Sequence, residues 1–292
     1  MTQEQFVPIH TRAGSLISAA ELHHELSSGT QPLLLDVRFT LEDGPRYSEY
    51  LDGHLPGAAF VDLEHDLAGN RTPGLGHYPV PSPEAFAESS RRWGLTTTSD
   101  VVVYSGYTGI SAGRLAWLLQ WYGHDKVRIL DGGLLGWTRE GLPLETSEVP
   151  SSAFGGFAPR AQSHLAASTS DAMELGRRGQ LVDVRARSQF ALKTPDQRRS
   201  TRRPGRIPGA INIPATSLHR RNGLLRSSAE MKAALEQHGI DYTQPVGAYC
   251  GGGVASAWAT FVLRAAGVDA RLFTASWSEY AADPRLPVEI EP

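Results

Sequence analysis

The chain has 292 residues, of which 40% are hydrophobic and 20% are charged, and its formal net charge at pH 7 is −3. Its length favours two domains over one, and its composition is that of an ordinary globular protein. The balanced charge and the lack of any apolar run of ~20 residues argue against nucleic-acid partners and against membrane insertion.

The sequence also favours a reducing compartment. Its first residues lack the apolar core of a secretory signal, and Glu4 precedes the first arginine, Arg12, which disfavours a transit peptide. Cys250 is the single cysteine, so neither an intrachain disulfide nor a four-cysteine zinc site can form. We therefore expect a cytoplasmic protein.

Short apolar segments alternate with segments of helical spacing in both halves of the chain. The predicted strands and helices are, in chain order, a strand at 101–104, a helix at 112–122, a strand at 127–130, a strand at 246–249, a helix at 255–266 and a strand at 270–273. This alternation predicts an α/β fold of two tandem domains, each a mainly parallel sheet flanked by helices. Residues 146–160 are rich in Ser, Gly and Pro, and we expect them to link domain 1–145 to domain 161–292.

The two halves are related by an internal repeat, because five segments recur in the same order. The matched pairs are 33–38 with 181–185, 54–58 with 206–210, 101–106 with 246–251, 136–137 with 276–277, and 142–145 with 286–289. At the position of Cys250 the first half carries Ser105. We therefore expect a reactive site in the second half only, with the first half as a non-catalytic partner that walls the site.

Cys250 lies between a predicted strand and a predicted helix and is followed by Gly251, Gly252 and Gly253. Backbone N–H groups of such a loop and of the helix N-terminus stabilise a thiolate or another anion built on it. A lone cysteine is most often a small buried side chain. Three glycines are costly unless the backbone must bend sharply or approach another group, so we interpret Cys250 as a nucleophile.

Taken together, these segments resemble the tandem-domain rhodanese family of sulfurtransferases, and within it the 3-mercaptopyruvate sulfurtransferase branch. The resemblance rests on Asp-Val-Arg after a strand, the segment 207–214, the Cys-Gly-x-Gly-Val loop and the segment 276–280. It implies that Cys250 takes a sulfane sulfur from 3-mercaptopyruvate or thiosulfate and becomes a persulfide. The sulfur would then pass to cyanide or to a thiol, either a small thiol or a thioredoxin-like protein, without a metal or organic cofactor.

The resemblance also implies the site residues. Those expected to be catalytic are Cys250, Gly251, Gly252, Gly253, Val254, Ala255 and Asp62, and those expected to bind substrate are Arg187, Gln189, Arg198, Arg199 and His77. Asp62 would handle a proton and His77 would contact the donor or the loop, the alternative for both being interdomain hydrogen bonding. Arg185 is expected to be structural, because its counterpart Arg38 lies in the half without cysteine.

Two positions depart from the family pattern. Gly252 stands where the branch has a serine that is proposed to assist the cysteine, and Gln189 stands where a substrate arginine is usual. A carboxylate donor still requires a cation. The candidates are Arg187, Lys193, Arg198 and Arg199, and the alternative for the basic run that holds the last two is a solvated loop. The uncharged loop 251–253 favours mercaptopyruvate over dianionic thiosulfate.

Two rival functions follow from the same loop. A cysteine phosphatase or arsenate reductase needs an arginine six residues after the cysteine, and Ser256 occupies that position. A thiosulfate-preferring rhodanese, or a persulfide-relay or binding module on the same fold, stays open as the alternative, because a fold does not determine a function.

Overall fold

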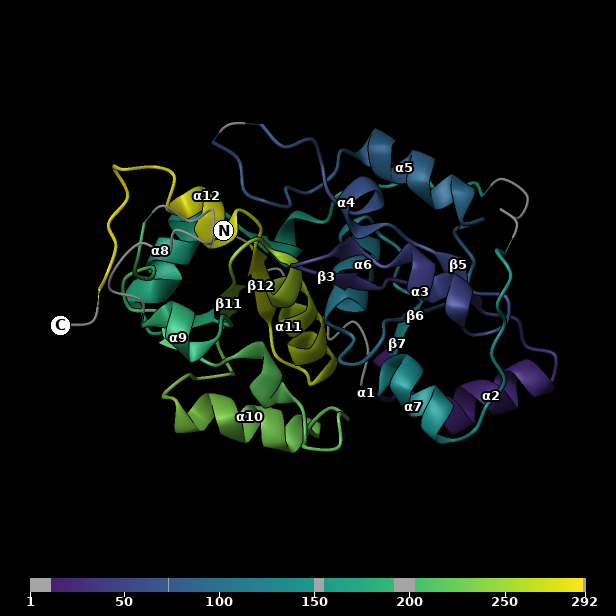
Figure 1. Ribbon diagram of the computed structural model, residues 1–292. Helices are drawn as coiled ribbons and strands as arrows, with labels where there is room; N and C mark the ends of the chain where they lie inside the picture. The colour runs from purple at the N-terminus through teal and green to yellow at the C-terminus, as the bar shows by residue number, and fades with distance from the viewer. Residues whose placement is uncertain (1–11, 73, 150–154, 192–202, 291–292) are drawn as a thin grey trace.

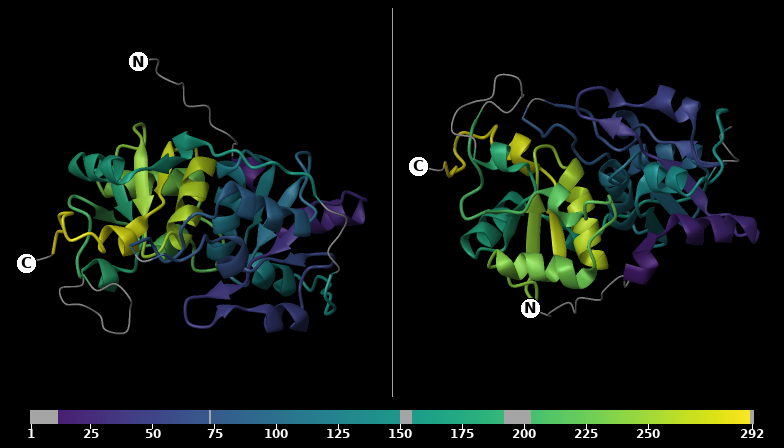
Figure 2. Two further views of the ribbon diagram at one scale, coloured as in Figure 1. Left: turned by 90° about the horizontal axis from the view of Figure 1, so that it is seen from above. Right: turned by 60° about the horizontal axis from the view of Figure 1, so that its bottom comes forward.

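The computed structural model describes residues 12–72, 74–149, 155–191 and 203–290. Figure 1 shows two halves side by side, the first on the right and the second on the left, and the views of Figure 2 show the same separation. Each half contains a five-stranded sheet with all strands parallel and with helices around it. The predicted α/β fold with two tandem domains is confirmed.

The first half contains the sheet β1-β7-β6-β2-β5 and a separate antiparallel hairpin, β3-β4. Its elements are α1 (Arg12–Ser15), β1 (Leu16–Ile17), α2 (Ala19–Ser27), β2 (Leu33–Asp36), β3 (Phe39–Thr40), β4 (Gly44–Pro45), α3 (Tyr47–Asp52), β5 (Ala59–Phe60), α4 (Leu63–Asp66), α5 (Pro83–Arg92), β6 (Val101–Tyr104), α6 (Ile110–Trp121), β7 (Val127–Leu130) and α7 (Gly133–Arg139).

The second half contains the sheet β8-β12-β11-β9-β10, which repeats the strand order of the first half. Its elements are η1 (Ser163–Leu165), β8 (Ala166–Ala167), α8 (Thr169–Arg177), β9 (Leu181–Asp183), α9 (Arg187–Phe190), β10 (Ile211–Asn212), η2 (Ala215–Leu218), α10 (Ser228–Gln237), β11 (Val246–Tyr249), α11 (Val254–Ala265), β12 (Ala270–Phe273) and α12 (Ser276–Tyr280).

Local sequence explains where the helices begin. Ser18 and Ser168 occupy equivalent positions before α2 and α8, and each closes a capping box with an acidic side chain three residues later. The helices expected at 112 and 255 begin earlier, at Ile110 and Val254. The reason is that Gly109 and Gly253 adopt left-handed φ angles of 68° and 92° and turn the chain directly into the helix.

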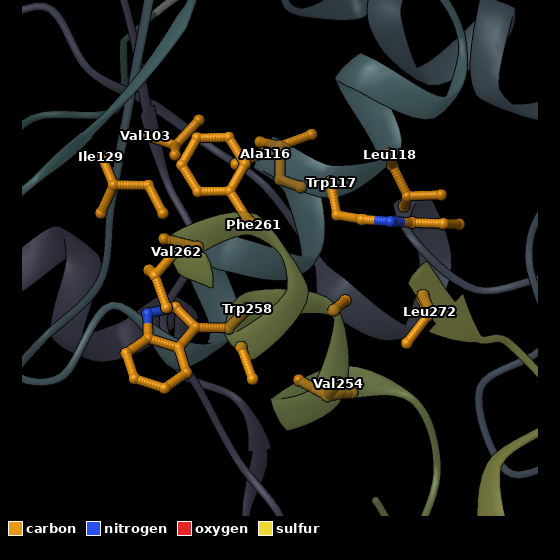
Figure 3. Close-up of a cluster of buried hydrophobic side chains, with 14 of the residues drawn as sticks. Val103, Ala116, Trp117, Leu118, Ile129, Val254, Trp258, Phe261, Val262 and Leu272 are labelled. Carbon is orange, nitrogen blue, oxygen red and sulfur yellow. The ribbon is translucent and has the colours of Figure 1, made fainter. Parts of the chain in front are cut away.

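The largest apolar cluster extends through both halves, while two smaller clusters lie on one half each. Helices α6 and α11 meet in the large cluster. Figure 3 shows the Phe261 ring of α11 beside Val103 and Ala116 of the first half. The loops that follow β6 and β11 therefore face one another across the boundary between the halves, at the carboxyl ends of the parallel strands.

The described part of the predicted linker lies along the first half. Gly155 N donates to Arg91 O at 3.2 Å, Phe157 N to Leu95 O at 3.2 Å, and Arg160 N to Tyr122 O at 3.0 Å. Within the ranges that the structure describes, no helix is long and apolar enough to cross a membrane.

Candidate active site

Cys250 follows β11 directly, and its sulfur lies at the N-terminus of α11. Gly253 N donates a hydrogen bond to Cys250 Sγ at 3.1 Å, and Ser256 Oγ donates another at 3.3 Å. The residue is only 5% exposed, so water competes little for these hydrogen bonds to the sulfur. Two donors and a helix N-terminus directed at one sulfur stabilise a thiolate and any persulfide formed on it.

The loop around Cys250 is fastened to the start of α12. Cys250 O accepts from Trp277 N at 2.9 Å, and Gly251 O accepts from Ser278 N at 2.8 Å. Ser276 Oγ accepts from Cys250 N at 3.4 Å and lies 3.5 Å from Ser256 Oγ. Three backbone or side-chain contacts therefore hold the cysteine in place before any substrate arrives.

Ser276 has an unusual backbone conformation. Its φ is +52°, and it is the one non-glycine residue with positive φ in the described ranges. The equivalent position in the first half is Gly133, with φ +55°, because Leu134 N binds Ser105 O as Trp277 N binds Cys250 O. The sequence pairing of 136–137 with 276–277 is therefore wrong by three residues. A side chain in this region is strained. The second half thus keeps a hydroxyl beside Cys250 where the first half has relieved the strain with glycine.

The first half forms the same loop without a thiol. Gly109 N donates to Ser105 Oγ at 3.1 Å, as Gly253 N does to Cys250 Sγ. Leu134 N and Leu135 N bind the carbonyls of Ser105 and Gly106, matching the contacts of α12 in the second half. The repeat thus extends to individual hydrogen bonds.

A cavity of about 540 Å³ opens over the cysteine and is walled by both halves. From the second half its lining includes Val184, Arg185, Ala186, Gln189, Pro214, Ala215, Thr216, Cys250, Gly251, Gly252, Val254 and Ala255. From the first half it includes Arg38, Phe39, Thr40, Leu41, Arg46, Glu49, Tyr78, Ser105, Gly106, Tyr107, Thr108, Ile110 and Ser111. A site of this size accommodates a small organic acid together with part of an acceptor.

The expected substrate-binding residues of the second half are placed as follows. Gln189 lines the cavity, and its Oε1 accepts from Ala186 N at 3.3 Å. Arg187 is exposed, with its guanidinium 5.4 Å from the Phe190 ring centre, and is not among the described residues that line the cavity. Arg198 and Arg199, together with Lys193, lie outside the described residues.

His77 lies against the cysteine loop. A Cβ on Gly252 would lie 3.1 Å from His77 Cβ and 3.1 Å from Tyr78 Cδ2, so the backbone at Gly252 passes close to the first half. His77 N donates to Ser278 Oγ at 3.0 Å. Burial, assisted by the charge of Arg71, lowers the pKa of His77, so its imidazole is neutral at pH 7.

Asp62 has a different environment from the one expected. It is the N-cap of α4, and its Oδ1 accepts from Glu64 N at 2.8 Å and from His65 N at 3.0 Å. It is not among the described residues that line the cavity over Cys250. Its geometry is that of a helix cap.

Arg38 and Arg185 occupy equivalent places in the cavity wall. Each guanidinium binds the aspartate two residues upstream, with closest distances of 2.7 Å to Asp36 and 2.6 Å to Asp183. Arg185 also lies over the Trp277 ring, 4.8 Å from its centre. Both arginines are buried and paired, as expected for a structural role.

Sequence reasoning did not single out Ser256 or Arg46 as site residues. Ser256 is the third residue of α11, and helical side chains point back toward the N-terminus, which is where Cys250 Sγ lies. The position of Ser256 in the first turn of a predicted helix could therefore have predicted its contact with Cys250. Arg46 lines the cavity from the first half and pairs with Asp43 at 2.7 Å and with Glu49. Nothing local in the sequence marks it, because the cavity joins segments far apart in the chain.

Comparison with known proteins identifies the domain type. The family model described as Rhodanese-like domain matches residues 18–140 and 166–283. SseB of Mycobacterium tuberculosis, provisionally named a thiosulfate sulfurtransferase, is 37% identical over 283 residues, covering 96% of this chain and 98% of that protein. The 3-mercaptopyruvate sulfurtransferase of Escherichia coli is 36% identical over 254 residues, covering 85% of this chain and 87% of that protein.

The fold agrees with a solved structure. The crystal structure of SseA from Escherichia coli, described as a 3-mercaptopyruvate sulfotransferase with the rhodanese fold, superimposes with a TM-score of 0.78 at 31% sequence identity. The superposition covers 90% of this chain and 98% of that one.

Proposed function

This chain belongs to the rhodanese family of sulfurtransferases, and we propose that it moves a sulfane sulfur from 3-mercaptopyruvate or thiosulfate to a thiol or cyanide through a persulfide on Cys250. The observation that carries this proposal is the environment of Cys250 Sγ, which accepts hydrogen bonds from Gly253 N and Ser256 Oγ at the wall of a cavity. The matching loop of the first half has Ser105 instead, so the persulfide forms in the second half.

The first half-reaction loads the cysteine. The Cys250 thiolate attacks the sulfur that is transferred, which is the thiol sulfur of 3-mercaptopyruvate or the outer sulfur of thiosulfate. An S–S bond forms between this sulfur and Cys250 Sγ. With 3-mercaptopyruvate the C–S bond breaks and its electron pair leaves as the enolate of pyruvate, which takes a proton. With thiosulfate the S–S bond breaks and sulfite leaves. Gly253 N–H and Ser256 O–H already face the sulfur that changes charge.

The second half-reaction unloads it. A thiolate or cyanide attacks the outer sulfur of the persulfide, and the electron pair of the broken S–S bond returns to Cys250 Sγ as thiolate. The product is a new persulfide or thiocyanate. No net oxidation occurs, because the sulfur moves between two nucleophiles.

Residues of the cavity wall are proposed to bind the sulfur donor. The side-chain-free loop at Gly251 and Gly252 supports 3-mercaptopyruvate over thiosulfate. Gln189, which lines the cavity, and His77, which lies against the cysteine loop, stay proposed as donor contacts. Arg187, Arg198 and Arg199 stay proposed as the cations for its carboxylate. Thiosulfate preference, or a persulfide relay to a binding partner, is the alternative.

The acceptor and setting are also proposals. A small thiol or a thioredoxin-like protein fits the chemistry, and a cytoplasmic location fits the single, reduced cysteine. We propose the domain division 1–145 and 161–292 with 146–160 as linker. The hydrogen bonds that hold residues 155–160 to the first half support that route.

Intact mass spectrometry tests the function. Incubation with either donor should add one sulfur atom to the wild type and none to Cys250→Ser, and cyanide should remove it as thiocyanate. Initial rates with the two donors then establish the preference. If neither donor adds sulfur to the wild type, the sulfurtransferase hypothesis is wrong and the binding-module alternative is favoured.

A further inference from the structure

Arg114, on α6 of the first half, is completely buried at the boundary between the halves. Its Nη1 donates to Gly253 O at 3.3 Å, and its Nη2 donates to Tyr78 O at 3.0 Å. Its remaining hydrogen bonds go to the carbonyls of Leu67 and Pro79, each at 3.3 Å. Within the described ranges it has no carboxylate partner, which is a costly arrangement for a buried charge.

Gly253 connects this charge to the reacting sulfur. Its N–H donates to Cys250 Sγ at 3.1 Å, while its carbonyl accepts from Arg114. Burial lowers the pKa of Arg114 to about 10, and the negative charge of Cys250 opposes that decrease. Arg114 is therefore protonated at pH 7, and its guanidinium faces the loop that carries the reacting sulfur.

The repeat shows that this charge is specific to the cysteine loop. Arg114 and Trp258 are both the fifth residue of their helix, α6 and α11, and each lies under the loop of the opposite half. Trp258 Nε1 is 3.7 Å from the Cβ position of Gly109, and Arg114 Nη1 is 3.5 Å from that of Gly253. A cation therefore faces the loop with the thiol, and an uncharged indole faces the loop without it.

Among the described residues around the loop, the other titratable groups are paired or neutral at pH 7, apart from Glu279, whose carboxylate accepts from Gly76 N at 3.0 Å. Arg38, Arg185 and Arg46 are each paired with carboxylates. Burial lowers the pKa of His77, and burial raises the pKa of Tyr78 and brings that of Tyr122 to about 12, so all three are neutral at pH 7.

We propose that Arg114 is a positioning residue for sulfur transfer: its guanidinium ties the Cys250 loop to the first half and supplies the positive charge that offsets the thiolate and the persulfide. This proposal deepens the proposed function and rests on it for its role in turnover. It also explains why a half without a cysteine contributes to the chemistry of its partner.

The experiment measures the rate of Cys250 alkylation by iodoacetamide against pH, together with kcat/KM for sulfur transfer. Arg114→Met should move the pH midpoint of alkylation upward by about one unit, because an opposite charge has been removed. Its kcat/KM at pH 7 should fall about tenfold. Arg114→Lys keeps the charge but loses the planar fork, so its midpoint should stay within a few tenths of a unit while kcat/KM falls about threefold.

Arg264→Met is the matched control, because Arg264 is a buried arginine near the other end of α11 that lies 3.7 Å from Asp269. It should lower thermal stability and leave the alkylation midpoint unchanged. If Arg114→Met has the same alkylation midpoint as the wild type, Arg114 has no electrostatic role at Cys250. If Arg114→Lys has the same kcat/KM as the wild type, the hydrogen bonds of the guanidinium do not position the cysteine loop. If Arg114→Met fails to fold, Arg114→Gln tests the electrostatic role by the same shift in midpoint, because the amide keeps hydrogen-bond donors and removes the charge. Alkylation needs no sulfur donor, so failure of the proposed function would be seen separately, as a wild type that gains no sulfur.

Discussion

Gly113 of α6 packs directly on Trp258 of α11: a Cβ on Gly113 would lie 2.4 Å from Trp258 Cβ and 2.6 Å from its Cα. The nearest atoms include backbone, so the contact cannot be relieved by rotating a side chain. Gly113→Ala should therefore force the two helices apart and destabilise the protein by about 3 kcal/mol. This exceeds the ~1 kcal/mol that alanine gains over glycine inside a helix. Urea unfolding measures the difference.

Gly136→Ala is the control for this substitution. Gly136 lies inside α7, and its Cβ would meet only Asp131 O at 3.4 Å. The higher helix propensity of alanine should then determine the effect, so the free energy of unfolding should be unchanged or rise by up to about 1 kcal/mol. Equal losses in both variants would show that Gly113 has no special packing role.

Ser256→Ala removes one of the two hydrogen bonds to Cys250 Sγ. A bond to a charged acceptor contributes about 1.5 kcal/mol, so kcat/KM should fall about tenfold, and the alkylation profile should move to higher pH. Thr260→Val is the control, because it removes a buried hydroxyl one turn further along α11 that has no partner among the described residues. Turnover of Ser256→Ala equal to that of the wild type would remove Ser256 from the site.

Ser276→Gly and Ser276→Ala separate strain from hydrogen bonding. Both lose the hydroxyl that accepts from Cys250 N, so both should lose activity. Only glycine relieves the positive φ, so Ser276→Gly should be more stable than Ser276→Ala by about 1 kcal/mol. Thermal unfolding and kcat/KM measured on the same samples test both parts. Alanine as stable as glycine would contradict the strain.

The stability of the protein should fall as the pH is lowered from 7 to 5. Burial lowers the pKa of His77, His124 and His219 below 6.5. The unfolded chain then takes up protons at about pH 6.5 and the folded chain only at lower pH, so the unfolding free energy decreases across this window. His219 also hydrogen-bonds Thr108 O at 2.9 Å across the boundary between the halves. His219→Gln should flatten the decrease, and exposed His24→Gln should not.

Much of the fold was predictable because the repeat appears twice in the sequence. The strands at Val101–Tyr104, Val127–Leu130, Val246–Tyr249 and Ala270–Phe273 have the predicted bounds. Each is an apolar run between polar or glycine-rich turns. The helices began earlier than expected because a glycine with positive φ is compatible with an N-cap, which the apolar spacing alone does not reveal.

The site was less predictable, since its contacts join distant segments. Cys250 and its glycines stand out locally, but Arg114 and Gly253 are 139 residues apart in the sequence and meet only after both halves have packed. In the sequence, Ser256 serves only to exclude a cysteine phosphatase, which has an arginine at that position. Asp62 matched a family position, yet its carboxylate is engaged as the cap of α4.

The apolar cluster shared by the two halves has a consequence for the history of the chain. After a duplication, the copy that loses its nucleophile is ordinarily free to drift or disappear. Here its inner face is also the inner face of the active copy, so deleting it would leave α11 with its apolar side in water. The cysteine-free copy is therefore required for folding as well as for the cavity wall that it supplies.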